Sequence, residues 1–148
     1  DNALGQIVLS GEISAIDYIS HNSKDLGIKR AIKLPVSAPF HCKLMNNATE
    51  IMKNEIQKLI FQESKIKLIS NVTAKEISDK EELKMLLIDQ IENRVRWRES
   101  VINMINNGVN HFIEIGPGKV LSGLVKRINR DVKIDTINSE TDIENLKI

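Results

Sequence analysis

The sequence predicts an α/β fold in which at least some of the strands are parallel. Short apolar strand patterns alternate with helical patterns along the chain, as in layered α/β domains. The 148 residues are 41% hydrophobic, enough for one globular domain or slightly more, with a core that needs no disulfide or metal. The 21 Lys and Arg residues nearly balance the 20 Asp and Glu residues, and this favours neither a nucleic-acid partner nor an anionic membrane.

The first 35 residues predict a strand, a helix and a second strand. QIVLSG at residues 6–11 is an apolar stretch bounded by glycines. Helical spacing starts at Glu12 and lasts until Gly27, a natural C-cap. Residues 28–34 alternate apolar and charged side chains, as a half-exposed strand does. Because these strands have open edges and the chain starts without methionine, we expect a piece of a subdomain whose remainder lies upstream.

A proline-stiffened link over residues 35–42 marks the predicted domain boundary. Pro35 and Pro39 each fix their own φ and bias the preceding residue away from helix. Beyond the link, apolar spacing predicts a regular series of elements. They are helix 44–60, strand 66–72, helices from 80 and from 97 to 108, strand 111–115, helix 120–128, strand 132–137 and a weak helix to 148.

The single cysteine, Cys42, excludes an internal disulfide framework and any CxxC metal or redox site. This usage suits a reducing compartment, so we expect the cytoplasm. We expect no membrane association, because no apolar run approaches the roughly 20 residues that span a bilayer. The first residues also lack the charged and apolar regions of a signal peptide.

His41 is the clearest candidate for a catalytic side chain. It follows the proline-stiffened link and precedes a long helix, where an imidazole can be held still and face a cleft. Histidine suits general base catalysis near neutral pH. The alternative is a helix-start histidine that caps or packs. Cys42 is interpreted as a buried, inert thiol, because neighbouring helical side chains point apart and His41 is poorly placed to activate it.

The GPGKV turn and Gln90 are two further features that could have either a structural or a functional role. GPGKV at residues 116–120 joins a strand to a helix, so its N–H groups either bind an anion or simply form a tight turn that needs glycine. Gln90 lies on an otherwise apolar helix face near the helix end. A polar side chain there must find a partner, so Gln90 either caps structure or orients a neighbour such as His41.

Other polar residues indicate little chemistry on their own. His21 and His111 have no companions at ligand spacing, so we interpret both as structural and predict no metal site. The chain has neither a GxSxG elbow nor a recognisable Ser, His and acid set, so it does not hold a complete nucleophilic site. Two groups of basic residues are either solvated surface or a surface that attracts an acidic partner. They are Arg94, Arg96 and Arg98, and Lys126, Arg127 and Arg130.

Four separated motifs stand in a definite order: NALGQIV at 2–8, VSAPFHC at 36–42, QIENRVRW at 90–97 and EIGPGKVL at 114–121. Together they resemble the C-terminal half of the malonyl-CoA:acyl carrier protein transacylases of bacterial fatty acid synthesis. The resemblance covers nearly the whole chain, and four motifs in order are far more specific than any one of them.

The resemblance implies a large α/β-hydrolase-like acyltransferase domain into which a smaller ferredoxin-like subdomain is inserted. Residues 1–35 would be the end of the ferredoxin-like subdomain, and residues 36–148 the C-terminal part of the large domain. The implied activity transfers malonyl from malonyl-CoA to the phosphopantetheine thiol of acyl carrier protein through a serine ester, without a cofactor. The nucleophilic serine would lie in a missing N-terminal half, which is therefore an implied partner.

The resemblance also implies roles for individual residues. His41 matches the histidine that takes the proton of the serine, and Gln90 matches a position whose main-chain carbonyl holds that imidazole. Phe40 resembles a bulky residue that favours malonyl over methyl-branched extender units. Asn2 and Gln6 fall on a substrate-cleft motif.

The match has departures, and it leaves alternatives. Ala3 and Leu4 replace a usual Ser-Pro, and Arg94 stands where proline is frequent. One alternative is a non-catalytic fragment that only packs against the missing half. The other is an unrelated α/β domain that uses GPGKV to bind a phosphorylated ligand.

Overall fold

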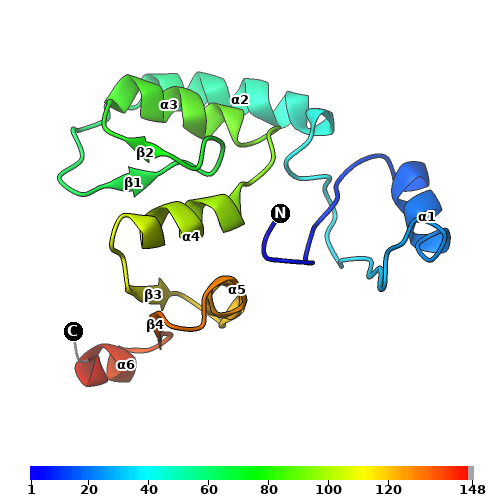
Figure 1. The fold of residues 1–148 in the computed structure, drawn as a ribbon. Helices are drawn as coiled ribbons and strands as arrows, with labels where there is room; N and C mark the ends of the chain where they lie inside the picture. Colours follow the sequence, from blue (N-terminus) through cyan, green and yellow to red (C-terminus); the bar gives the residue numbers. More distant parts are fainter. Residues whose placement is uncertain (147–148) are drawn as a thin grey trace. The chain divides into compact units, whose positions relative to one another are not determined.

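The computed structural model describes residues 1–146. The chain forms two compact units, which are described here one at a time (Figure 1). Unit 1 consists of Asp1–Ile7, Thr73–Lys75 and the chain from Arg96 onward, and unit 2 consists of Val8–Val72 and Glu76–Val95. The expected division into residues 1–35 and 36–148 stays a prediction.

Unit 1 is built on a parallel β-α-β arrangement. Strands β3 (His111–Ile115) and β4 (Lys133–Ile137) pair in parallel, with His111 opposite Lys133 and Ile115 opposite Ile137. Helix α5 (Val120–Ile128) connects the strands and packs on both of them, while α4 (Trp97–Asn106) packs on α5. The parallel pair confirms the predicted mixture of helices and partly parallel strands.

The core of unit 1 lies where α4, α5 and the start of β4 meet. Val101 of α4 is fully buried, and it clusters with Val125 and Val132. Partly buried side chains such as Trp97 and Phe112 complete this cluster. Burying a side chain of this size contributes about 1.5–3 kcal/mol. Helix α6 (Glu140–Asn145) follows β4 and begins at a capping box formed by Ser139 and Asp142.

Unit 2 is mainly helical. Helix α1 (Ile13–His21) comes first, and the short 3-10 helix η1 (Lys43–Met45) runs into α2 (Asn46–Lys58). Helix α2 packs against α3 (Lys80–Asp89), as Figure 1 shows. The short strands β1 (Leu68–Ile69) and β2 (Glu76–Ile77) form an antiparallel pair, and α3 contacts β2.

Several predicted elements are wrong or shortened. The predicted strands at 6–11 and 28–34 are absent, because a strand requires a paired backbone and only the isolated bridge between Ala3 and Gln6 forms in these stretches. The strand at 66–72 shrinks to β1, and β2 was not predicted.

Two predicted helix ends also differ from the structure. Helix α1 ends at His21, well before Gly27. At its C-cap, both the main-chain N–H and the side-chain amide of Asn22 donate to the Tyr18 carbonyl, an arrangement that favours asparagine at helix ends. Gly27 still has a left-handed φ of 74° in the turn that follows. The predicted final helix ends at Asn145, and the last two residues of that prediction, 147 and 148, lie outside the described residues. No described helix combines the length and apolar character needed to cross a bilayer.

Candidate active site

The main chain of His41 is held in an uncommon conformation. His41 lies in the turn before η1 with a φ of 62°, in the left-handed region that costs a non-glycine residue about 1–2 kcal/mol. Its N–H group donates to the carbonyl of Ile91 at 3.2 Å. This bond anchors the turn to the segment that follows α3, and so it fixes the position of the main chain from which the imidazole extends.

The imidazole of His41 makes a second bond to the same segment. Its Nδ1 lies 2.7 Å from the main-chain oxygen of Gln90. Because a carbonyl only accepts hydrogen bonds, Nδ1 must carry the hydrogen, and Nε2 keeps a lone pair. Within residues 1–146 nothing bonds to Nε2, and the side chain is exposed. The ring is therefore arranged to accept a proton at Nε2.

Helix α3 explains why these two carbonyls are available. The helix starts at Asp79, whose side chain accepts from the N–H of Glu82 at 2.7 Å, and it ends at the C-cap Gln90. The last carbonyls of an α-helix have no partner within the helix. At the end of α3, His41 supplies partners to the carbonyls of Gln90 and Ile91, one from its ring and one from its main chain.

The side chain of Gln90 also has a partner. Its Oε1 accepts from Nδ2 of Asn71 at 3.1 Å. The prediction that Gln90 needs a polar partner is met by this bond, and the residue is the C-cap of α3 as well. Sequence analysis missed Asn71. In the sequence, Asn71 is a polar residue inside the predicted strand 66–72, and the 19-residue separation from Gln90 hides their contact.

The residues on either side of His41 face different surroundings. Phe40 is 49% exposed. Cys42 is half-buried, and its thiol donates to the carbonyl of Pro39 at 3.1 Å. The structure thus gives the Cys42 thiol a main-chain partner that is not the His41 ring.

Asn2 and Gln6 come together in a tight turn of unit 1. The N–H of Asn2 donates to the carbonyl of Gln6 at 3.0 Å, and the N–H of Gln6 donates to Ala3 at 2.9 Å. The side chain of Gln6 accepts from Nη1 of Arg127 on α5 at 2.9 Å. The predicted site residues therefore fall into two groups, with Asn2 and Gln6 in unit 1 and Phe40, His41 and Gln90 in unit 2.

The start of α5, directly after the GPGKV turn, already holds a carboxylate that belongs to the chain. The N–H groups of Leu121 and Ser122 donate to the carboxylate of Glu114 at 3.0 and 2.7 Å. Ser122, followed by other main-chain N–H groups at the start of α5, holds the pKa of Glu114 below its usual value. Gly118 donates to the side chain of Asn138 at 2.7 Å. Internal acceptors thus take the N–H groups that a phosphorylated ligand would need.

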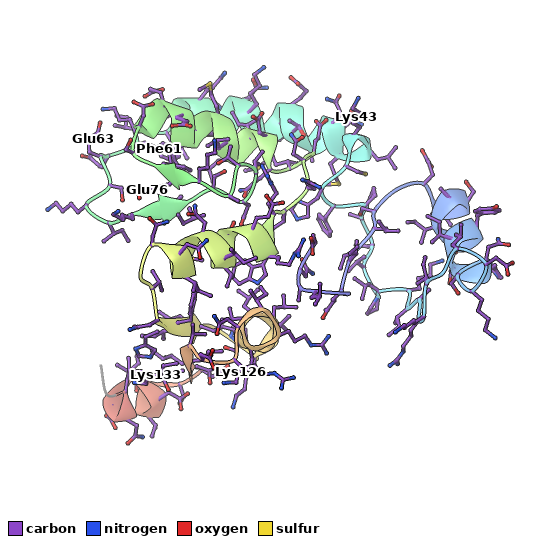
Figure 2. The ribbon with its side chains drawn as sticks, viewed as in Figure 1. Lys43, Phe61, Glu63, Glu76, Lys126 and Lys133 are labelled. Carbon is purple, nitrogen blue, oxygen red and sulfur yellow. The ribbon has the colours of Figure 1, made fainter. Side chains whose placement is uncertain are left out.

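Several other polar side chains have internal partners. His111 Nε2 lies 2.7 Å from a carboxylate oxygen of Asp135. The two basic residues labelled in Figure 2 on unit 1 also bind nearby: Lys126 donates to the carbonyl of Arg130 at 2.7 Å, and Lys133 pairs with Asp135 at 3.3 Å. Within the described residues, no group of three or more His, Cys, Asp or Glu side chains is arranged to hold a metal ion.

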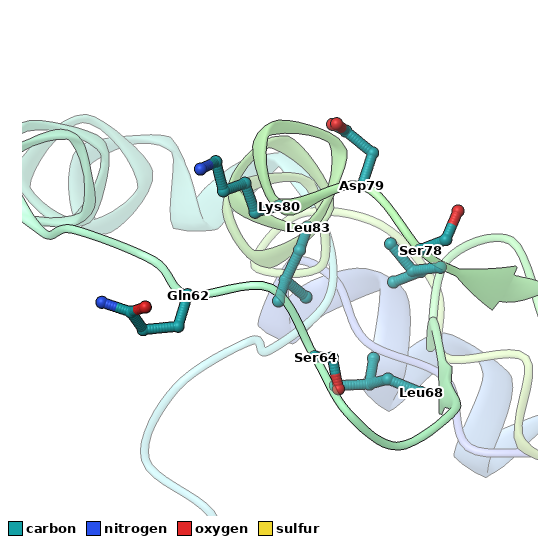
Figure 3. Close-up of a pocket in the computed structure, with 8 residues that line it drawn as sticks. Gln62, Ser64, Leu68, Ser78, Asp79, Lys80 and Leu83 are labelled. Carbon is teal, nitrogen blue, oxygen red and sulfur yellow. The ribbon is translucent and has the colours of Figure 1, made fainter.

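A small pocket in unit 2 lies beside β1, β2 and the start of α3. Leu83 of α3 points toward the segment that carries Ser64 and Leu68 (Figure 3). The cavity of about 10 Å³ has room for roughly one water molecule. Neither His41 nor Gln90 lines it, so it is not a substrate site for this histidine.

Comparison with known proteins identifies relatives over nearly the whole chain. No family model matches it. Over 143 residues the chain is 43% identical to the malonyl CoA-acyl carrier protein transacylase of Bacillus subtilis, an alignment that covers 97% of this chain and 45% of the relative. The chain thus spans less than half the length of this curated relative.

Solved structures show the same similarity. An acyl-carrier-protein S-malonyltransferase from Bartonella henselae matches with a TM-score of 0.85 and 43% identity, covering 91% of this chain and 43% of that one. A malonyl transacylase solved in complex with its type II PKS acyl carrier protein matches with a TM-score of 0.85 and 33% identity, covering 91% and 44%.

Fold and sequence together relate the chain to the transacylases that act on acyl carrier protein. The named relatives are malonyl-CoA:acyl carrier protein transacylases, so the resemblance indicated by the four motifs is confirmed. Coverage of about 45% of the relative is consistent with a C-terminal half.

Proposed function

We propose that this chain supplies the histidine base of a bacterial malonyl-CoA:acyl carrier protein transacylase. The observation that carries the proposal is the 2.7 Å contact between Nδ1 of His41 and the main-chain oxygen of Gln90. It leaves Nε2 as the proton acceptor, the arrangement of a nucleophile-activating histidine in which a carbonyl replaces the usual carboxylate. The similarity to named transacylases supports the reaction class.

The reaction proceeds in two displacements. A serine from polypeptide outside these residues attacks the malonyl thioester, and its proton passes to Nε2 of His41. The tetrahedral intermediate collapses to a malonyl-serine ester, and the imidazolium returns the proton to the departing coenzyme A sulfur. The thiol of acyl carrier protein then attacks the ester by the same route, with His41 acting first as base and then as acid.

The proposal extends to the neighbouring residues and to the partners. We assign Phe40, which adjoins His41 and is half exposed, the role of limiting the size of the acyl group. Asn2 and Gln6 belong to the substrate cleft of the complete protein, an α/β-hydrolase-like domain with a ferredoxin-like insertion that ends at residue 35. The enzyme uses no cofactor, acts in fatty acid biosynthesis in the cytoplasm and has malonyl-CoA and acyl carrier protein as substrates.

Replacing His41 in the complete protein tests this function. His41→Ala and His41→Asn each remove the base, so we expect malonyl transfer to acyl carrier protein to slow by roughly 10²–10⁴-fold. Asparagine tolerates the left-handed φ of this position, so the second variant separates loss of the base from backbone strain. Stopped-flow or quenched-flow malonyl loading measures the rate, and unchanged loading in both variants would exclude the assigned role.

A second candidate is a non-catalytic fragment that only packs against the missing half. Its supporting observation is the large apolar surface, for example Ile115 at 78% exposure and Val120 at 72%. Intact-mass measurement of malonyl loading in the complete protein, with wild type compared with His41→Ala, separates the two ideas. The transacylase proposal expects a malonyl-serine adduct that forms much more slowly in the variant, whereas a chain that only packs expects equal loading in both proteins. Neither idea expects an adduct on the 148-residue chain alone.

A further inference from the structure

We propose that Asn71 is a positioning residue that sets the tautomer of His41 by holding Gln90 in place. Nδ2 of Asn71 donates to Oε1 of Gln90 at 3.1 Å, and the main-chain oxygen of Gln90 accepts from Nδ1 of His41 at 2.7 Å. Asn71 thus reaches the imidazole through one intermediate residue. The catalytic consequence rests on the proposed function, whereas the effect on the tautomer does not.

The position of Gln90 makes such support useful. Gln90 is the C-cap of α3, and helix ends fray more readily than helix interiors. Its N–H donates to the carbonyl of Leu86 at 3.1 Å, whereas its own carbonyl faces His41 and not an N–H group of the helix. A bond from outside the helix adds to this anchor, and Asn71 supplies one to the side chain of the same residue.

Asn71 is mounted on an anchored part of the chain. It follows β1, and the preceding residue, Ser70, is buried. The hydroxyl of Ser70 accepts from the N–H of Val72 at 3.1 Å, so the turn on both sides of Asn71 is fixed. A side chain that extends from such a turn holds its partner better than one on a free loop, because less conformational freedom is lost when the bond forms.

A second asparagine braces the other end of the same segment. Nδ2 of Asn46, at the start of α2, donates to Oε1 of Glu92 at 3.2 Å. The segment 90–92 is therefore bonded from three sides, by His41, Asn71 and Asn46. Of the two asparagines, Asn71 is the one that bonds to the residue whose carbonyl touches the imidazole, so its loss should act on the ring more directly than loss of Asn46.

The test measures the His41 ring and the reaction separately in the complete protein. The ¹⁵N shifts of the ring nitrogens report the tautomer, and loss of signals in His41→Asn identifies those of His41. In Asn71→Ala we expect the Nε2–H form of His41 to gain population, while His21, whose Nδ1 also faces a main-chain carbonyl, stays unchanged. Asn54→Ala removes an exposed asparagine of α2 and is the matched control.

The kinetic expectation follows from the same mechanism. Asn71→Ala should lower kcat for malonyl transfer on the order of tenfold, part of the contribution of a positioned base, with KM for malonyl-CoA unchanged. Gln90→Leu removes the same bond from the other side but keeps the carbonyl. The double variant should therefore be no slower than the slower single variant, because both changes break one interaction.

Three outcomes would overturn the inference. One is an unchanged His41 tautomer in Asn71→Ala, another is additive effects of the two substitutions, and the third is an equal response in Asn54→Ala. If Asn71→Ala does not fold, Asn71→Ser and Gln90→Leu are read for the tautomer instead. Failure of the proposed function looks different, since wild-type protein would then load no malonyl while the tautomer still responded to Asn71.

Discussion

His41 and His111 show how the partner atom decides what a histidine can do. The Nδ1 of His41 meets a carbonyl, which orients the ring without adding a charge and leaves Nε2 free to accept a proton. The Nε2 of His111 lies 2.7 Å from the carboxylate of Asp135, so this nitrogen is already engaged in a bond within the protein. The pair joins two parallel strands, and we infer a structural role for His111.

The His111 and Asp135 pair predicts acid-sensitive stability in unit 1. The hydrogen bond from His111, and then the contact with Lys133, lower the pKa of Asp135. A carboxyl whose pKa is lower in the folded state stabilises the protein above its unfolded pKa of about 3.9, and this stabilisation disappears as the pH falls through the folded pKa. We therefore expect Asp135→Asn to lower the unfolding temperature near pH 6 but to have little effect near pH 2.

Thermal unfolding followed by circular dichroism across this pH range checks the prediction. Asp131→Asn is the control, because Asp131 is an exposed aspartate just before the same strand. A pH-independent difference between wild type and Asp135→Asn would contradict the linkage to the charge of Asp135.

At the scale of elements, Glu114 links the end of β3 to the beginning of α5. Its carboxylate accepts from two N–H groups that a helix start leaves without intrahelical partners. Replacing it by alanine should destabilise the protein by about 1 kcal/mol, the usual effect of losing a helix cap. Glu114→Gln keeps one acceptor oxygen and should lose less. Urea unfolding at neutral pH measures both, and equal stability of wild type and Glu114→Ala would exclude the capping role.

The same linkage gives Glu114 a pH signature. Its pKa is lowered by Ser122 and the main-chain N–H groups, so its contribution is present above its ordinary pKa and is lost as the pH falls through the folded value. The stability difference between wild type and Glu114→Gln should therefore vanish in acid.

The elements that the sequence predicts well are those whose partners are close in the chain. Strand β3 occurs at the predicted residues 111–115 because its partner β4 and the helix between them follow at once. The stretches 6–11 and 28–34 have strand-like patterns, yet among the described residues they form no strand pairing beyond the isolated bridge between Ala3 and Gln6. A strand pattern describes which faces are apolar, and only a neighbour converts it into a strand.

The candidate site shows the same limit. Helical spacing places Gln90 near a helix end, and the proline link singles out His41, but 49 residues separate them and no local pattern reports their contact. The resemblance to a family implies that contact, while residue spacing leaves it open. Neither residue spacing nor the resemblance identifies Asn71, because its bond to Gln90 depends on how the turn after β1 packs.

At the scale of the whole molecule, the apolar surface indicates that the described chain is one part of a larger core. In unit 1, Ile115 at the end of β3 is 78% exposed, and Val120 at the start of α5 is 72% exposed. Parallel sheets usually have both faces covered, whereas β3 and β4 form a sheet of only two strands within residues 1–146. We infer that other polypeptide covers this end of unit 1 in the complete protein.

The change in the free energy of unfolding on substitution of Ile115 tests directly whether other polypeptide covers this end of unit 1. Ile115→Ser in the complete protein should reduce the free energy of unfolding by about 1.5–3 kcal/mol if the side chain is buried there. Val101→Ala, at a fully buried position, is the positive control and should cost about 2 kcal/mol. Asn54→Ala should cost less than about 0.5 kcal/mol, as surface substitutions do. If Ile115→Ser behaves like Asn54→Ala while Val101→Ala is destabilised, this end of β3 stays in water and the remaining polypeptide packs elsewhere.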